Sequence, residues 1–375
     1  MDKLKEFFSE NDVRIGIGKD FTTNPPVYYS SLDEAFYHYF LTFRDKKETY
    51  HFLFDIHSWS RESLAFNFTG GISNIVAAIL GFHRFIELWL KDILRRIDPF
   101  LSVKFLEKEE ELFQYLNGKL AAEDVKTIEF SEALKRIKQA FKSYEETSQT
   151  YIDHLKPYEF IKLEGNIETL KYLSEWRNRI MHNGSTLPNL FALEFLVSQK
   201  VIPLIAEVLE AEKKYLKGYS PRYFKTPTGI NVMQEILTVK FEAGDFNDIR
   251  KSDDLGFALL KLGHLKEIGR SAYNLTSTFI DGRAITESYY NSPVKRDEKF
   301  AATERTHEDF FELKNCICCG VNAMVIYRQD VFDFASNSKT FISWLQCYHC
   351  GYSLKNNVGD PAFFELCDIP LFATI

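Results

Sequence analysis

Two short cysteine motifs near the C-terminal end of the sequence have the spacing of metal ligands. The residues concerned are Cys316, Cys319 and Gly320 in the first motif, and Cys347, Cys350 and Gly351 in the second. A Cys-x-x-Cys turn brings two thiolates to one ion, zinc takes four such ligands at tetrahedral angles, and the glycine permits a tight turn. Because four thiolates leave no position open for water, the motifs predict a structural Zn²⁺ ion rather than a catalytic one.

Two neighbouring residues leave this ligand set partly open. Cys318 is an alternative to Cys319, although Gly320 stands directly behind Cys319 only. His349 is an alternative ligand in the second motif, although the spacing of Cys347 and Cys350 is the better one. Six unrelated buried cysteines are the competing interpretation, but paired motifs with matching glycines rarely arise by chance.

The segments between the two motifs have strand character. Residues 324–328 and 341–346 are the two predicted strands, and the whole stretch 313–355 resembles a zinc ribbon. We expect it to form a small docking or recognition unit, separate from any chemistry elsewhere in the chain.

A second motif, Arg-Asn-x-x-x-His, consists of Arg177, Asn178 and His182. Histidine exchanges protons near neutral pH, and the arginine guanidinium stays charged and fits phosphate oxygens. RNA cleavage by the 2′-hydroxyl needs these functions, because protons move and charge develops on the phosphate. The competing interpretation is structural: Arg177 forms a salt bridge, for example to Glu87, and His182 is a polar residue at a helix end.

Helix geometry limits how these side chains meet. Arg177 and His182 are five residues apart, about 140° around a straight helix, so they do not share a face. Asn178 and His182, four residues apart, do share one. Either the helix distorts near His182, or a second copy of the protein completes the site.

Apolar spacing and turn residues predict the elements that carry these motifs. The predicted helices span residues 35–43 after a capping box at 31–34, and residues 72–97, 128–147, 167–182, 190–215 and 255–272. Pro99 ends the second of them, and Asn183-Gly184 ends the fourth. The four helices between 72 and 215 favour a bundle.

The motif within such a bundle resembles the HEPN superfamily, whose ribonuclease members carry Arg, four to six residues, then His, commonly with Asn after the Arg. Residues 85–91, which include Glu87 and Lys91, are similar to the Glu-x-x-x-Lys pattern of that family's early helix. The resemblance covers residues 71–215. It implies a dimer whose two motifs line one cleft, with Arg177 and His182 as catalytic residues.

Two further residues are interpreted beside this motif. Asn178 would orient the motif through hydrogen bonds, and we predict that Glu87 supports the site by orienting Arg177. One HEPN branch is regulated by modification of a Tyr two residues after the His, and Gly184 occupies that place here, which disfavours this regulation.

The resemblance implies a metal-independent endoribonuclease that leaves 2′,3′-cyclic phosphate and 5′-hydroxyl ends. Such proteins commonly act in bacteria as toxins or anti-phage (abortive infection) effectors, which implies an RNA substrate and a regulatory protein or phage trigger. The alternative is a catalytically inactive HEPN and zinc-ribbon module that binds nucleic acid, nucleotide or protein as a scaffold or sensor.

Composition and charge limit the ways in which the protein can bind RNA. The net charge of −7 and pI of about 5.8 argue against a protein that coats nucleic acid non-specifically. Local basic clusters at 95–96 and 135–142 are candidates for an RNA groove, although charge runs are more often solvated helix faces. The basic and aromatic residues of 213–225 suit single-stranded RNA, or equally a linker that packs on the bundle.

The predicted fold is mainly α. Its parts are a mixed α+β region at 1–70, a HEPN-like bundle at 71–215, a linker and helical region at 216–310 and the zinc-ribbon-like unit at 311–375. No run of 18 apolar residues and no signal-peptide core occurs, so we expect a cytoplasmic protein without membrane contact. In that compartment cysteines are better interpreted as thiols or metal ligands than as disulfides.

Overall fold

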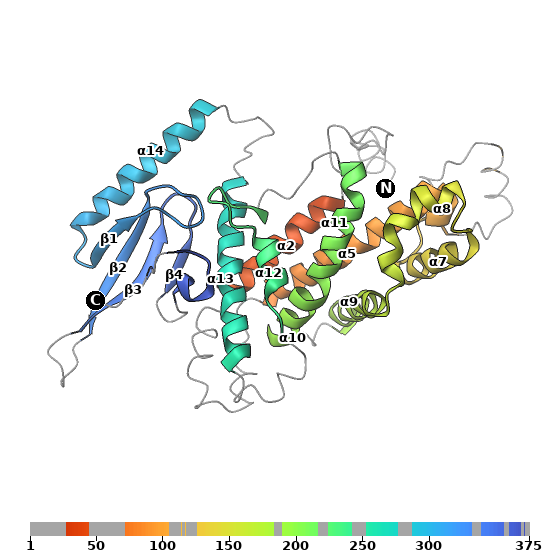
Figure 1. The fold of residues 1–375 in the computed structure, drawn as a ribbon, viewed down its shortest axis with the longest axis horizontal. Coiled ribbons are helices and arrows are strands. Elements are labelled where there is room, and N and C mark those ends of the chain that lie inside the picture. Colours follow the sequence, from red (N-terminus) through yellow and green to blue (C-terminus); the bar gives the residue numbers. More distant parts are fainter. Residues whose placement is uncertain are drawn as a thin grey trace, which may run out of the picture. The chain divides into compact units, whose positions relative to one another are not determined.

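A computed structural model shows the fold of the protein (Figure 1). The described residues are 28–44, 72–104, 114, 117, 126–183, 190–216, 224–241, 253–276, 287–331, 339–355, 360–368 and 371. Among them the protein is mainly helical, with one four-stranded antiparallel sheet near the C-terminal end. None of the described helices is long and apolar enough to cross a bilayer.

The described residues belong to two compact units. Unit 1 includes those within Met1–Asp33, Gly81–Lys162 and Glu207–Ser220, and unit 2 includes those within Glu34–Leu80, Leu163–Ala206 and Pro221–Ile375. The division differs from the four parts predicted from the sequence, which stay a prediction.

Helix α5 (Ile72–Ile97) has the bounds that its apolar spacing predicts. Ile79, Ile86 and Ile93 recur on its buried side and are fully covered, as expected for a stripe at 3.6-residue spacing. Asp98 and Pro99 end the helix, and the Asp98 carboxylate accepts a hydrogen bond from the Phe100 amide that starts the 3-10 helix η2 (Pro99–Ser102).

The predicted helix over residues 128–147 is two helices in the structure. Helix α7 (Phe130–Ser143) ends at Tyr144, and helix α8 (Gln149–His154) follows it in unit 1. Ser148 explains the break, because its hydroxyl accepts a hydrogen bond from the Tyr151 amide and so caps a new helix. The 3-10 segment η4 (Lys156–Lys162) completes this region.

Unit 2 contains the predicted helix over 167–182 and the first part of the one over 190–215, whose residues from Glu207 onward belong to unit 1. Helix α9 (Glu164–Asn183) packs on the π-helical segment η5 (Phe195–Val201), which separates α10 (Leu190–Glu194) from α11 (Ile202–Leu216). The sequence predicts one unbroken helix there. Pro203 is the physical reason for the difference, because it has no amide hydrogen to donate to the preceding turn.

Helix α2 (Tyr28–Arg44) starts earlier than predicted. The proposed capping box is wrong: Ser31 is 3% exposed and lies inside the helix. The strands expected of the mixed α+β region at 1–70 fall in residues outside those that the structure describes. In unit 2, α2 packs on α13 (Asp253–Thr276), where a side chain larger than Gly at 269 would collide with the Phe40 ring.

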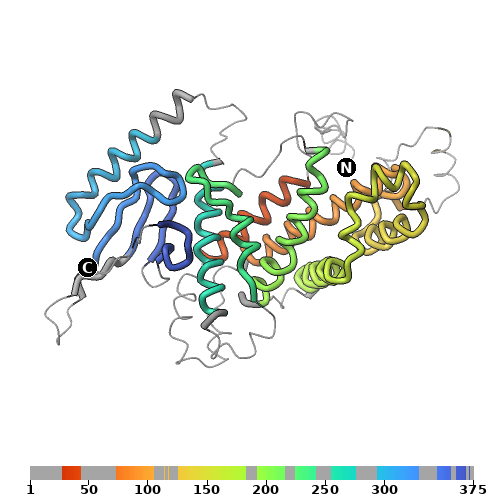
Figure 2. The backbone as a smooth tube through the Cα atoms, in the orientation of Figure 1, coloured from red at the N-terminus to blue at the C-terminus, as the bar shows by residue number. Residues whose placement is uncertain are grey.

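A four-stranded sheet lies near the C-terminal end of the chain and is followed by the 3-10 helix η10 (Pro361–Phe364). Strands β1 (Phe310–Lys314), β2 (Met324–Val331), β3 (Lys339–Cys347) and β4 (Ser353–Lys355) pair in sequence order, all antiparallel (Figure 1). Strands β2 and β3 confirm the two predicted strands. Helices α12 (Val232–Thr238) and α14 (Glu287–Thr303) were not predicted, and neither were the edge strands β1 and β4. Figure 2 traces the same path as a tube.

Candidate functional site

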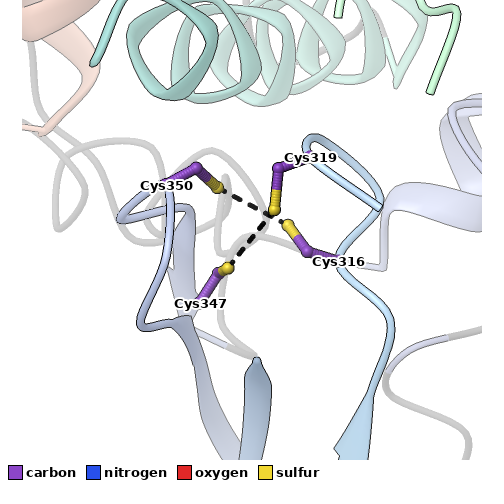
Figure 3. Close-up of side chains that lie close together, drawn as sticks. All are labelled: Cys316, Cys319, Cys347 and Cys350. Atoms are coloured by element: carbon purple, nitrogen blue, oxygen red, sulfur yellow. Dashed lines mark hydrogen bonds between the residues drawn. The ribbon is translucent and has the colours of Figure 1, made fainter. Parts of the chain in front are cut away.

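The four predicted metal ligands meet at one end of the sheet. Cys316 and Cys319 precede β2, while Cys347 ends β3 and Cys350 follows it, so pairing of β2 with β3 brings the two motifs together (Figure 3). The four Sγ atoms lie within 4.8 Å of one another, and all four residues are buried. The Sγ atoms are 3.6 Å apart between Cys316 and Cys350 and 3.7 Å apart between Cys319 and Cys347.

These distances suit a metal ion. Four thiolates about 2.3 Å from a zinc ion at tetrahedral angles are about 3.8 Å from one another. A tetrahedral set of four sulfurs suits zinc or iron, so the site fits a metal ion, and zinc as its identity stays a prediction.

The two motifs have the same backbone structure. The Gly320 amide donates to the Cys316 carbonyl at 2.8 Å, and the Gly351 amide donates to the Cys347 carbonyl at 2.9 Å. Gly320 has φ of 76° and Gly351 has φ of 75°, a left-handed conformation in which glycine avoids the Cβ clash. The predicted role of both glycines is confirmed.

The two alternative ligands have other partners. The Cys318 thiol donates to the Ile268 carbonyl on α13 at 3.6 Å, and His349 Nδ1 is 3.1 Å from an Asp297 carboxylate oxygen on α14. Neither belongs to the cluster of four sulfurs, so the geometry favours Cys319 over Cys318.

The thiols influence one another's protonation. Hydrogen bonds with Cys316 and Cys319 hold the pKa of the Cys347 thiol well below its usual range. The thiolate is the form that binds a metal ion, so the arrangement favours a deprotonated ligand at this position.

Both motifs dock on other parts of unit 2. Arg270 and Asn274 on α13 donate to the carbonyls of Gly351 and Cys350, and the Glu267 carboxylate accepts from the Ser353 amide at 2.9 Å. The first motif is held by a turn of residues 224–231, whose Thr228 hydroxyl donates to the carbonyls of residues 317 and 318. Sequence reasoning missed these positioning residues; charged residues inside the apolar pattern of 255–272 were the available signal.

Replacing Gly351 by Ala is expected to destabilise the protein by about 1–2 kcal/mol, because a Cβ atom is unfavourable in the left-handed region. The new methyl would also approach the Asn274 amide at 3.6 Å. Thermal unfolding measures the effect. The control is Gly165→Ala in α9, where a Cβ atom meets no heavy atom within 4 Å. Equal stability of the two variants would contradict the predicted strain.

The Arg-Asn-x-x-x-His motif lies in the C-terminal half of α9. The Arg177 guanidinium donates to the Asn178 side-chain oxygen at 2.9 Å. Arg177 is half-buried, while Asn178 and His182 are exposed. Because α9 is α-helical through Asn183, no helix distortion brings His182 to Arg177 within one chain.

This half of α9 has little cover. Leu170 and Leu173 are buried in the first half, but no residue from 174 to 182 is buried. Trp176 and Ile180 continue the buried stripe and remain half-exposed, and Met181 is 56% exposed. An apolar stripe that runs beyond its own core is typical of an interface.

Glu87 has local partners. Its carboxylate is 2.6 Å from Lys91 Nζ and 3.7 Å from His83 Nδ1, all on α5 in unit 1. Arg177 belongs to unit 2. The predicted role of Glu87 in orienting Arg177 therefore stays a prediction.

Two arginines of the predicted RNA groove serve the interior of unit 1 instead. The half-buried Arg96 side chain lies between the Asp92 and Glu212 carboxylates, and the buried Arg136 donates to the carbonyls of Leu101 and Val103. In the 213–225 segment, Tyr215 agrees with the second of the two alternatives, a segment that packs on the helices, because its ring lies 4.2 Å from the Arg96 guanidinium carbon. These residues are not available to stack on bases or bind phosphate.

Comparison with known proteins adds no relative: no family model matches the chain, and no curated protein or solved structure is detectably similar to it.

Proposed function

We propose that the protein is a metal-independent endoribonuclease of the HEPN type that acts as a homodimer. The observation that carries the proposal is the Arg177–Asn178 hydrogen bond on a half of α9 that has no buried side chain. Arginine and histidine of this kind supply charge and proton transfer, which RNA cleavage by the 2′-hydroxyl requires. The cysteine cluster would have a structural role, because four thiolates complete the tetrahedral coordination of a metal ion and leave no position for water.

The geometry of α9 supports the proposed dimer. Arg177 and His182 point about 140° apart on a regular helix, so one helix does not direct both at one phosphate. A second copy packed on Trp176, Ile180 and Met181 would cover the apolar stripe and bring a second motif close. Arg177 of one copy and His182 of the other would then act on the same scissile phosphate.

Arg177→Ala and His182→Ala are each expected to reduce RNA cleavage in EDTA by at least a hundredfold, since general acid–base catalysis contributes about 10²–10⁴-fold. The substrate is a mixed-sequence, single-stranded RNA, and mass spectrometry of the products should show 2′,3′-cyclic phosphate ends. Arg179→Ala, which changes an exposed arginine on the same helix, is the control for Arg177. His307→Ala, which changes a histidine with a half-exposed side chain, is the control for His182.

Three outcomes would count against the proposal. Cleavage that persists in both motif variants would place the activity elsewhere. Absence of cleavage of any RNA would favour a binding module, in which α9 and the ribbon recognise nucleic acid, nucleotide or protein. A strictly monomeric protein in analytical ultracentrifugation would exclude the composite site.

If the proposal holds, a role as a bacterial toxin or anti-phage effector follows from the family resemblance alone. The RNA-end sequences of cells that express wild type or His182→Ala would identify the target.

A further inference from the structure

Helix α13 carries a band of buried polar and charged side chains. Those buried to 3% exposure or less are His264, Lys266, Glu267, Arg270 and Ser271. Buried charge is tolerated only when it is paired and hydrogen-bonded, so the partners of these side chains fix the position of α13. Lys266 and Glu267 are adjacent in sequence, and they serve two different parts of unit 2.

Glu267 and Arg270 hold the second cysteine motif. The Glu267 carboxylate accepts from Arg270 at 2.7 Å and from the Ser353 amide at 2.9 Å, and Arg270 donates to the Gly351 carbonyl. Asn274 donates to the carbonyl of Cys350, which is itself a ligand of the candidate metal site. The backbone conformation of this motif and the buried side chains of α13 therefore depend on each other.

Lys266 holds the start of the π-helical segment. Its ammonium group pairs with Glu194, donates to Thr42 at 2.8 Å and lies 4.2 Å from the Tyr39 ring centroid. The Tyr39 hydroxyl donates to the other Glu194 oxygen at 2.7 Å. Lys266 and Glu194 are both fully buried, so a shift of α13 that separated them would leave an uncompensated buried charge.

Glu194 connects Lys266 to the π-helical segment η5, on which α9 packs. It ends α10, and its carbonyl accepts from the Ser198 hydroxyl inside η5 at 2.6 Å. Helix α9 packs on η5, and the part of α9 that carries Arg177 and His182 has no buried side chain of its own. The order of α9 thus depends on the packing surface that η5 presents.

We propose that metal binding at the four cysteines orders helix α9 through α13, so that the Arg-Asn-x-x-x-His segment is held in place only in the metal-loaded protein. This replaces the separation of ribbon and bundle expected from the sequence with a coupling between them. It does not depend on the proposed ribonuclease activity.

Hydrogen exchange of the full chain tests the coupling directly. Protein loaded with Zn²⁺ is compared with the same protein stripped by a chelator, and amide exchange is followed by mass spectrometry. We expect the amides of residues 171–182 to exchange at least tenfold faster after stripping, together with those of the cysteine motifs. The proposal is overturned if only the motif amides change, or if the chain does not bind Zn²⁺.

Thermodynamic reciprocity gives a second test that does not need the stripped state to stay folded. If metal binding orders α9, a substitution that makes the ordering of α9 less favourable must weaken metal binding by the factor by which it lowers the ordering equilibrium constant. Leu173→Ala removes a buried side chain of α9, and Tyr172→Ala removes its 54% exposed neighbour. We expect Zn²⁺ affinity, measured by competition with a chromophoric chelator, to fall at least fivefold for Leu173→Ala and less than twofold for Tyr172→Ala. Equal affinities would overturn the coupling.

The pair Lys266→Met with Glu194→Gln tests the route. Both charges are removed together, so neither is left buried alone. In this double variant the tenfold response of α9 to stripping is expected to fall below threefold, while the cysteine motifs respond as before. Lys213→Met with Glu210→Gln, which removes an exposed pair, is the control and should keep the full response. A full response in both double variants would show that the Lys266–Glu194 pair is not the route.

Discussion

Cys347→Ser is expected to destabilise unit 2 by more than about 4 kcal/mol, the range associated with loss of a metal site. Three sulfurs and a hydroxyl bind zinc weakly compared with four thiolates, and binding free energy at a structural site is folding free energy. The loss should not stay within the sheet, because α13 donates hydrogen bonds to the carbonyls of Cys350 and Gly351. Thermal unfolding with metal analysis of the purified protein measures both effects.

The control for this change is Cys367→Ser. Cys367 is half-buried and is not one of the four clustered cysteines. It should keep one metal equivalent per chain and nearly the wild-type melting temperature. Equal metal content and stability of Cys347→Ser and Cys367→Ser would show that the four cysteines are an apolar cluster and not a metal centre.

Local patterns predicted the parts of the structure that depend on local physics. The bounds of α5 follow from its apolar period and from Pro99. The cysteine turns follow from the glycine behind each pair, and both glycines have the expected positive φ. In each case the information lies within a few residues of the feature, so no knowledge of the fold is needed.

Features that depend on tertiary contacts were missed. Helix α14 is polar and charged, and it contacts residues that are distant in sequence. Its Asp297 carboxylate, for example, lies beside His349. The edge strands β1 and β4 are three to five residues long and are formed by pairing with β2 and β3. Segments of this kind have little intrinsic preference for helix or strand, so contacts with neighbouring elements determine their secondary structure.

The candidate catalytic motif shows a different limit. The sequence gives the identity of Arg177, Asn178 and His182 and their place on a helix, and α9 agrees with that placement. Whether they form a site depends on a second molecule, and a partner surface leaves no local pattern beyond apolar residues such as Trp176.

Charged residues were misjudged for a related reason. Arg95 and Arg96 are adjacent in sequence, look alike as parts of a basic cluster and are both half-buried, yet Arg96 alone of the two pairs with the described acidic side chains of unit 1. Its guanidinium is 2.9 Å from Glu212, also pairs with Asp92, and donates to the Tyr158 hydroxyl at 2.7 Å. The position of Arg96 between two carboxylates and the Tyr215 ring arises only in the folded chain. A count of charges along the sequence does not show it.

The largest effect expected in unit 1 follows from this network: Arg96→Met should lower the free energy of unfolding by about 3–5 kcal/mol. Glu212 is fully buried and accepts hydrogen bonds from Trp89 at 3.1 Å and from Tyr158 at 2.6 Å. Without the guanidinium, the Glu212 and Asp92 carboxylates would face each other in the core with no cation between them.

The matched control is Arg95→Met on the adjacent residue, which is half-buried like Arg96 but is no hydrogen-bond partner of Asp92 or Glu212 among the described residues. It should change the free energy of unfolding by less than about 0.5 kcal/mol, as substitutions outside such networks usually do. Urea unfolding followed by circular dichroism gives both values. The comparison also separates structure from RNA binding: if Arg96 bound RNA, Arg96→Met would weaken RNA binding in a stably folded protein. A stable, well-folded Arg96→Met variant would therefore contradict the buried network and return this arginine to the candidate groove.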